Sequence, residues 1–368
     1  MRWRWCWPIL VLAGCAQPQP SLPVQTFPGG PSATPVAFSA LPGWANDDTA
    51  AALATFVRSC KALARMPPDQ SLGGAGFAQQ TGGQAGLWLN ACNGARDVAP
   101  GDTPAAQAYF ETYFIPYEIA GDALITGYFE PEYRGSEDYE REYTVPLYAK
   151  PDDPALANLP RAAIDEHALY RAAPVTAYVH SHVDAFMLQI QGSGRILLPD
   201  GNTLRVGFDG QNGQPYTPIG RILVQDGDLA PDDVSFQSIS AWLKAHPGRA
   251  RGIMEQNARY VYLRPLGDLP NDEGAPGALG VPLTAGRSLA VDPAVIPLGM
   301  PIFVATTNPL TQAPLDRLTI AQDTGGGIHG AGAADLFFGA GHAAEAIAGR
   351  MQQQGQLYIL IPRPTPAG

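Results

Sequence analysis

Helical spacing of hydrophobic residues is confined mainly to the first part of the chain. From Asp47 or Asp48, either of which can cap a helix, apolar positions recur at intervals of three and four up to about Met66. A second helix is predicted from Thr103, taken as the capping residue before Pro104, with a stripe of aromatic side chains along it. We therefore expect helices before the strand-rich part of the chain.

Short β-prone runs separated by Gly, Pro, Asp and Asn dominate from about position 123 onward. These runs predict strands at 124–129, 143–148, 186–191, 195–198, 203–208, 260–264, 288–291, 301–305, 317–321 and 356–361. Helices are predicted to interrupt them at 235–246, 248–257 and 342–354. The pattern indicates a mainly β fold, a sheet or barrel, with peripheral helices.

The first residues have the form of a lipoprotein signal. Arginines at positions 2 and 4 precede an apolar run that is too short to span a membrane, and Leu12-Ala-Gly-Cys15 has the form of a lipobox. We expect residues 1–14 to be removed, Cys15 to be lipidated and the proline-rich segment 15–45 to act as a tether. The alternative is a plain signal peptide with an incidental cysteine. Ala16, in place of Asp, resembles outer-membrane sorting signals.

The remaining cysteines and the histidines bear on disulfides and metals. Cys60 and Cys92 are left as a pair in a chain that reaches an oxidising compartment, which predicts a disulfide. The six histidines show no HExxH or comparable ligand spacing, so no metal and no organic cofactor is expected. His180 and His182 are expected on one face of a strand, without a metal.

The charge balance argues against one class of partner. The chain carries 34 acidic and 23 basic residues, a net charge of −11, and no basic run after position 4. Binding to a phosphate backbone needs clustered Lys and Arg, so nucleic acid is not an expected partner.

The candidate chemistry lies in aspartates near the C-terminus. Asp323-Thr-Gly is the local signature of an aspartic protease, but such an enzyme needs two carboxylates, and this chain has one copy of the motif. Asp335 follows twelve residues later, and Asp292 precedes Pro293 at the end of a predicted strand. The glycines of 325–330 would let the backbone approach a ligand or another strand closely.

These segments resemble a known family. Residues 290–299, 321–330 and 334–339 look like the three-aspartate domain. The upstream part is similar to the central domain of the membrane-bound lytic murein transglycosylase A family, through the segments 126–131, 143–148, 186–194 and 219–223. The resemblance covers about residues 45–362.

The resemblance implies a split architecture. Residues 46–130, with the N-terminal helices, and 265–362 would form a six-stranded double-psi β-barrel. Residues 131–264 would form a second, inserted β-domain, with the substrate groove between the two.

The resemblance also implies a reaction. The family cleaves the β-1,4 bond from N-acetylmuramic acid to N-acetylglucosamine in peptidoglycan and leaves 1,6-anhydromuramyl ends without using water. Asp335 would be the single acid/base, protonating the glycosidic oxygen and then taking the proton of the muramyl C6 hydroxyl. A raised pKa would suit this role, and the neighbours 336–338 could supply it by desolvation.

Further site residues follow from the same resemblance. Asp323 would support catalysis or, as we favour, be structural, accepting N–H groups from 325–327, and Asp292 would be a structural turn residue. The expected substrate-binding residues are Thr126, Gly127, Tyr128, Gln191, Gly192, Ser193, Gly194, Gly325 and Gly326. Without the resemblance, the alternative for 191–194 is a plain β-turn, which we favour less.

The chain departs from the family at a few positions. Many relatives carry Lys where His329 stands and a basic residue within 331–334, which bears on affinity more than on reaction type.

We therefore expect a lytic transglycosylase anchored by lipid to the periplasmic face of the outer membrane, with peptidoglycan glycan strands as its partner. The alternatives are a glycan hydrolase that uses a second carboxylate and water, and a non-catalytic peptidoglycan-binding lipoprotein.

Overall fold

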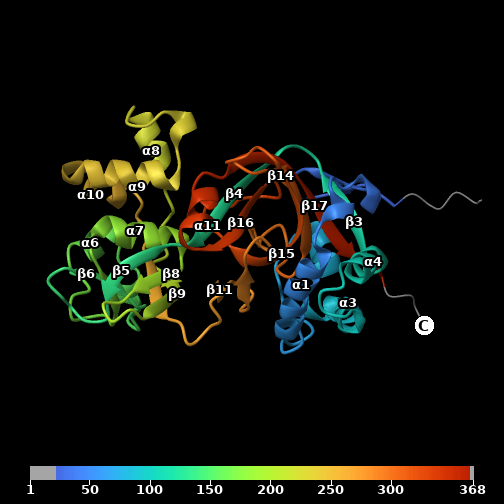
Figure 1. Ribbon diagram of the computed structural model, residues 1–368, viewed down its shortest axis with the longest axis horizontal. Coiled ribbons are helices and arrows are strands. Elements are labelled where there is room, and N and C mark those ends of the chain that lie inside the picture. The colour runs from blue at the N-terminus through green and yellow to red at the C-terminus, as the bar shows by residue number, and fades with distance from the viewer. Residues whose placement is uncertain (1–21, 365–368) are drawn as a thin grey trace, which may run out of the picture.

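Two lobes lie side by side along the long axis of the molecule (Figure 1). The computed structural model describes residues 22–364, so the predicted signal peptide, the lipobox and Cys15 lie outside the described residues. Within 22–364, none of the helices combines the length and the apolar character needed to cross a bilayer.

A closed barrel of six strands forms the centre of the first lobe. Its ring order is β17-β14-β15-β13-β16-β4, and β4 pairs again with β17. The strands are β4 (Ala123–Glu130), β13 (Ser288–Val291), β14 (Pro301–Thr307), β15 (Pro314–Thr324), β16 (Ala333–Ala340) and β17 (Gln352–Pro362). The pairs β13–β15 and β16–β4 are parallel, and the other pairs in the ring are antiparallel. The barrel predicted from the family resemblance is therefore confirmed.

The length of β17 closes the ring. Its first residues pair with β4, with Gln352 opposite Thr126, and its later residues pair with β14, with Ile359 opposite Ile302. The last helix is consequently shorter than the predicted 342–354: α11 (Gly341–Ala348) ends first, and β17 begins at position 352. Residues 352–354 were predicted to be helical, but they form a strand because they pair with β4 to close the barrel.

The expected tether is in part wrong, because the segment from Gln25 to Asn46 belongs to the fold. β1 (Gln25–Thr26), β2 (Ser32–Pro35) and β3 (Phe114–Ile119) extend the sheet beyond β17, and the short helices η1 (Phe38–Ala40) and η2 (Trp44–Asn46) follow β2. Phe27 and Trp44 are only 1% and 4% exposed. The Trp44 indole donates a hydrogen bond to Glu111 Oε1 at 2.9 Å. Burial of these aromatic rings outweighs the proline-rich composition.

This lobe also contains helices that precede β3 in the chain (Figure 1). They are α1 (Thr49–Leu63), α2 (Gly76–Gly82), α3 (Leu89–Gly94) and α4 (Thr103–Tyr113), with the 3₁₀ turns η3 (Ala85–Trp88) and η4 (Ala95–Asp97). Asp48 caps α1, whereas Asp47 forms an ion pair with Arg287 at 2.8 Å. Asp102 caps α4, so Thr103 is its first residue and not its cap.

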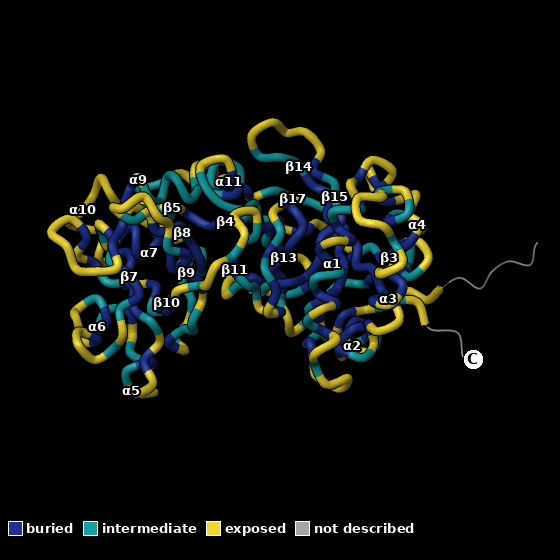
Figure 2. The backbone as a smooth tube through the Cα atoms, turned by 60° about the horizontal axis from the view of Figure 1, so that its bottom comes forward, coloured by how far each residue is buried: buried dark blue, intermediate teal, exposed yellow. Residues whose placement is uncertain are grey.

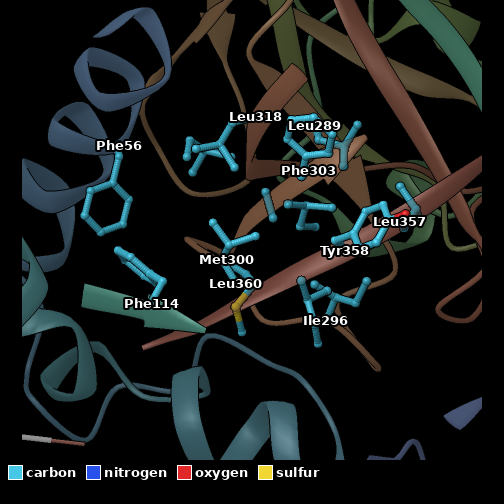
Figure 3. Close-up of a cluster of buried hydrophobic side chains, with 14 of the residues drawn as sticks. Phe56, Phe114, Leu289, Ile296, Met300, Phe303, Leu318, Leu357, Tyr358 and Leu360 are labelled. Atoms are coloured by element: carbon cyan, nitrogen blue, oxygen red, sulfur yellow. The ribbon is translucent and has the colours of Figure 1, made fainter. Parts of the chain in front are cut away.

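Apolar side chains from the helices and the barrel meet in one core (Figure 3). Phe56 of α1 packs edge-on against Phe114 of β3, with ring centroids 5.8 Å apart. The predicted disulfide joins Cys60 of α1 to Cys92 of α3. Figure 2 shows how the dark, buried segments concentrate inside each lobe.

A second sheet of six strands forms the other lobe, in the order β10-β9-β8-β5-β7-β6. The strands are β5 (Glu132–Ser136), β6 (Val145–Tyr148), β7 (Val175–Val179), β8 (Gly194–Leu197), β9 (Thr203–Gln211) and β10 (Val261–Pro265). The helices of this lobe are α5 (Pro154–Ala157), α6 (Arg161–Asp165), α7 (His182–Gln191), α8 (Ile219–Gln225), α9 (Phe236–Ala245) and α10 (Pro247–Glu255), with the turn η5 (Pro231–Asp233). A hairpin of β11 (Glu273–Pro276) and β12 (Pro282–Thr284) follows β10.

Helix α7 replaces the strand predicted at 186–191. Ser181 caps it by accepting the Asp184 N–H at 3.1 Å, and Gly192 ends it in the left-handed conformation with φ 79°. Positions 183–189 are all buried. A helix surrounded by core on every side loses its polar stripe, so its sequence resembles a buried strand. His180 and His182 therefore do not share a strand face.

A buried carboxylate ties the two sheets together. Glu130, at the end of β4, is 1% exposed and pairs with Arg195 of β8 at 3.1 Å and Arg205 of β9 at 3.2 Å. It also accepts the Ala275 N–H at 2.6 Å. Because an unpaired buried charge is costly, these partners fix how β4 leaves the barrel.

The disulfide closes a loop of 32 residues between α1 and α3. We expect the Cys60→Ala/Cys92→Ala variant to lose about 3–4 kcal/mol of unfolding free energy, because the open loop gains entropy when the chain unfolds. Denaturant titration measures this. Reductant should lower the stability of the natural chain to that of the variant and leave the variant unchanged; equal stability without reductant would contradict the prediction.

Candidate active site

Asp335 lies on β16, which runs between β4 and β13. In register it stands opposite Thr126 on one side and Ala290 on the other. Its neighbours Ala334 and Leu336 belong to the barrel core, so alternation along the strand directs Asp335 and Phe337 to the opposite face. Of the residues expected to desolvate Asp335, Phe337 shares its face and Leu336 points away.

The Asp335 carboxyl is short of hydrogen-bond partners. Its Oδ1 atom is buried and has no partner in the described part of the chain. The pKa of this carboxyl is raised to about 7. Burial is the largest cause, a hydrogen bond from Thr126 lowers the pKa, and the charge of Asp323 raises it. A group with this pKa is available in both protonation states near neutral pH, as an acid/base catalyst requires.

Asp323 lies near the end of β15 in a different environment. Its Oδ2 accepts the Tyr128 hydroxyl at 3.0 Å, and its Oδ1 accepts the Ala278 N–H at 3.0 Å. Burial raises the pKa of Asp323. Hydrogen bonds from the backbone of Thr324 and Ala278, and a smaller contribution from Tyr128, lower it. The glycine loop expected to supply its donors does not do so. Both oxygens of Asp323 are thus engaged, unlike those of Asp335.

Asp292 organises the turn after β13. Its Oδ1 accepts the Ala294 N–H at 2.9 Å, and its Oδ2 accepts the Gly330 N–H at 2.7 Å. Asp292 therefore holds the end of the glycine-rich segment 325–330 against the turn, which supports the structural role that the sequence suggested.

Two residues of the second lobe reach the glycine-rich segment. A Cβ on Gly326 would collide with Nη1 of Arg259, and a Cβ on Gly327 would lie 3.3 Å from the Tyr216 ring. The charge of Asp335 contributes to the raised pKa of Tyr216, after burial, so Tyr216 lies near the catalytic candidate. The sequence analysis did not identify Arg259 or Tyr216. The one local sign of such a contact was the run of glycines at 325–327, because glycine lets another part of the chain approach the backbone closely.

A groove of about 280 Å³ lies between the lobes. Asp335 is not among its lining residues, but Thr126, which stands opposite Asp335 in register, is. Among the predicted binding residues, Thr126, Gly127 and Gln191 line it, and Tyr216 lines it as well. A Cβ on Gly127 would lie 2.8 Å from Ala348 Cα, so glycine is needed for β4 to pass α11. The Gln191 side chain accepts the Phe129 N–H at 3.0 Å.

The other predicted binding residues lie away from the groove. Gly192 to Gly194 connect α7 to β8 and are not among the groove's lining residues; Ser193 is buried and Gly194 pairs with Val206. Tyr128 is buried beneath the carboxylates, where it donates to Asp323. Gly325 and Gly326 lie in the loop that Arg259 contacts. Across residues 22–364 no group of His, Cys, Asp and Glu could hold a metal ion.

The raised pKa of Asp335 predicts a pH-dependent stability. The folded state binds this proton more tightly than the unfolded chain, whose carboxyl titrates near 3.8, so stability is lost as pH rises from there to about 7. Asp335→Asn should be as stable as the natural chain near pH 4 and more stable at pH 8, by up to about 4 kcal/mol.

Chemical denaturation across that pH range checks this, with the exposed Asp138→Asn variant as control. A stability difference that does not change with pH would contradict a raised pKa at Asp335.

Comparison with known proteins places these features in a family. Residues 124–264 match the MltA specific insert domain, and residues 287–361 match the 3D domain. The chain is 32% identical over 259 residues to membrane-bound lytic murein transglycosylase A of Escherichia coli K12, which covers 66% of this chain and 67% of the relative.

Solved structures agree. A membrane-bound lytic murein transglycosylase from Agrobacterium tumefaciens has a TM-score of 0.79 and 29% identity, covering 89% of this chain and 97% of its own. MltA from Neisseria gonorrhoeae has a TM-score of 0.75 and 29% identity, covering 94% and 98%. E. coli MltA with bound chitohexaose has a TM-score of 0.67 and 25% identity, covering 92% and 95%. The chain therefore belongs to the MltA family of membrane-bound lytic murein transglycosylases.

Proposed function

We propose that the chain is a lytic murein transglycosylase in which Asp335 alone serves as acid and then as base. The observation that carries this assignment is the Asp335 carboxyl, which has a pKa raised to about 7 and an unpaired, buried Oδ1. Its neighbour in register, Thr126, lines the groove between the lobes, as does Gly127. The curated relatives carry the name lytic murein transglycosylase A.

The reaction needs one carboxyl group in two protonation states. Protonated Asp335 gives its proton to the oxygen of the β-1,4 bond from N-acetylmuramic acid to N-acetylglucosamine as that bond breaks. The resulting carboxylate takes the proton of the muramyl C6 hydroxyl while that oxygen bonds to C1. The product carries a 1,6-anhydro ring, Asp335 regains its proton, and no water is consumed.

The environment of Asp323 argues against the hydrolase alternative. An inverting or retaining glycosidase needs a second carboxylate free to activate water or to attack C1. Both oxygens of Asp323 already accept hydrogen bonds, from Tyr128 and Ala278. Asp323 then acts on Asp335 through its charge, which helps to keep the pKa of the acid high.

The inter-lobe groove is the proposed binding site for the glycan strand. Thr126, Gly127, Gln191 and Tyr216 line it and offer hydroxyl, backbone, amide and aromatic surface, which suits sugar rings. E. coli MltA has been solved with chitohexaose bound. Gly325 and Gly326 would face the same ligand from the loop, while Gly192, Ser193 and Gly194 would set the position of Gln191.

The names of its relatives and its first residues support a proposed location for the protein. Relatives are named membrane-bound. We place this chain at the periplasmic face of the outer membrane, held by lipid on Cys15. A proposed division into a barrel domain, 46–130 with 265–362, and an inserted domain, 131–264, rests on the two separate sheets; β1 and β2 add residues before 46 to the barrel domain.

The reaction can be tested with purified murein sacculi and a soluble form that begins at Leu22, so that β1 and β2 are kept. The natural sequence should release muropeptides ending in 1,6-anhydromuramic acid, identified by mass spectrometry. Asp335→Asn should lower the rate by about 10²–10⁴-fold, because it cannot transfer the proton. Reducing-end products would favour the hydrolase, and no products from the folded protein would favour a binding lipoprotein.

The charge of Asp323 should be visible in the pH–rate profile. Removing it in Asp323→Asn lowers the pKa of Asp335, so the alkaline limb of the profile should move to lower pH. The rate should recover as the pH is lowered, since the acid is then protonated again. If the rate of Asp323→Asn is instead as low as that of Asp335→Asn at every pH, Asp323 has a direct catalytic role.

A further inference from the structure

Arg259 brings a charged group from the second lobe to the loop beside the catalytic candidates. It lies between α10 and β10, and its guanidinium packs so closely on Gly326 that a Cβ there would collide with Nη1. Its Nε donates to the Gln214 carbonyl at 3.0 Å, which fixes the direction of the side chain. Arg259 is therefore held in place over the 325–327 loop.

The outer nitrogens of this guanidinium have no partner within residues 22–364. Seven other arginines form ion pairs with carboxylates, and Arg259 is not one of them. An arginine positioned by its Nε, with both Nη groups unoccupied, presents the planar fork that binds carboxylates in a bidentate manner.

The inter-lobe groove has an excess of positive charge; Arg259 is not one of its lining residues, but Tyr216, which contacts the same glycine loop, is. Arg221 and Arg350 line it, and neither forms an ion pair in the described chain, while Asp and Glu are absent from its lining residues. This is unusual in a chain with 34 acidic and only 23 basic residues. A groove of this composition favours a negatively charged ligand over a neutral one.

We propose that Arg259 is a substrate-binding residue that pairs with a carboxylate of the peptidoglycan strand. The inference rests on the proposed function and names the feature of the substrate that this site recognises. Two groups of peptidoglycan carry this chemistry: the lactyl carboxyl of a muramyl residue without a peptide, and the carboxylates of the stem peptide where one is attached. Tyr216, which packs on Gly327 beside Arg259, limits solvent at the contact and so strengthens the pair.

Binding measurements can isolate this contact from catalysis. In the Asp335→Asn background, in which turnover is about 10²–10⁴-fold slower, the affinity of Arg259→Gln would be measured for three ligands. Chitohexaose has no carboxylate, peptide-free murein glycan has lactyl carboxylates, and peptide-bearing glycan has stem-peptide carboxylates with the lactyl group amidated. We expect binding of a carboxylated ligand to weaken about 10- to 100-fold, and binding of chitohexaose to stay within about 2-fold.

The pattern of losses identifies the group. A loss confined to peptide-free glycan assigns the lactyl carboxyl, a loss confined to peptide-bearing glycan assigns the stem peptide, and a loss for both assigns the shared carboxylate chemistry. Equal losses for all three ligands, or none for any, would overturn the proposal. Arg259→Lys should recover part of the affinity because it keeps the charge without the fork.

Two controls keep the result interpretable. Arg134→Gln removes an exposed arginine of the same lobe and should leave all three affinities unchanged. Thermal melts establish that Arg259→Gln is folded. Failure of the proposed function would show separately, as an absence of 1,6-anhydro products from the natural sequence, whatever Arg259→Gln does to binding.

Discussion

Placing β16 between β4 and β13 is the constraint on which the account of the site depends. Pairing on both sides holds Asp335 opposite Thr126 and Ala290, and strand alternation sets it on the face away from the core residue Leu336. The carboxyl is thereby desolvated without receiving a hydrogen bond at Oδ1. An aspartate on a solvated loop would ionise near pH 4 and could not serve as an acid at neutral pH.

The second lobe completes what the barrel begins. Glu130 ends a barrel strand and pairs with Arg195 and Arg205 of the second sheet, so the buried ion pairs fix where that sheet starts. Arg259 and Tyr216 then reach the glycine loop. Asp335 belongs to the barrel and Arg259 to the second lobe, whereas the groove is lined by residues of both lobes.

Much of this could be predicted from sequence, for physical reasons that differ between elements. Strands such as β13 and β15 carry dense apolar runs bounded by turn residues. The barrel and the acid were suggested by the resemblance of the segments around Asp323 and Asp335 to the three-aspartate domain. Helix α7 was missed because burial on every side removes periodicity. The segment around Trp44 was missed because proline-rich composition hides long-range packing. The ion pairs of Glu130 and the reach of Arg259 join residues far apart in sequence, and no local pattern encodes such contacts.

The central claim is that one carboxyl, that of Asp335, keeps its proton close to neutral pH. Carbon-13 NMR of protein labelled at the aspartate carboxyl carbon would measure this directly, with Asp335→Asn identifying the resonance. The account predicts a carboxyl that titrates near pH 7 in the natural chain and is missing from the variant. If the resonance lost in Asp335→Asn titrates near pH 4 in the natural chain, Asp335 is an ordinary solvated carboxylate, and the single-acid account is wrong.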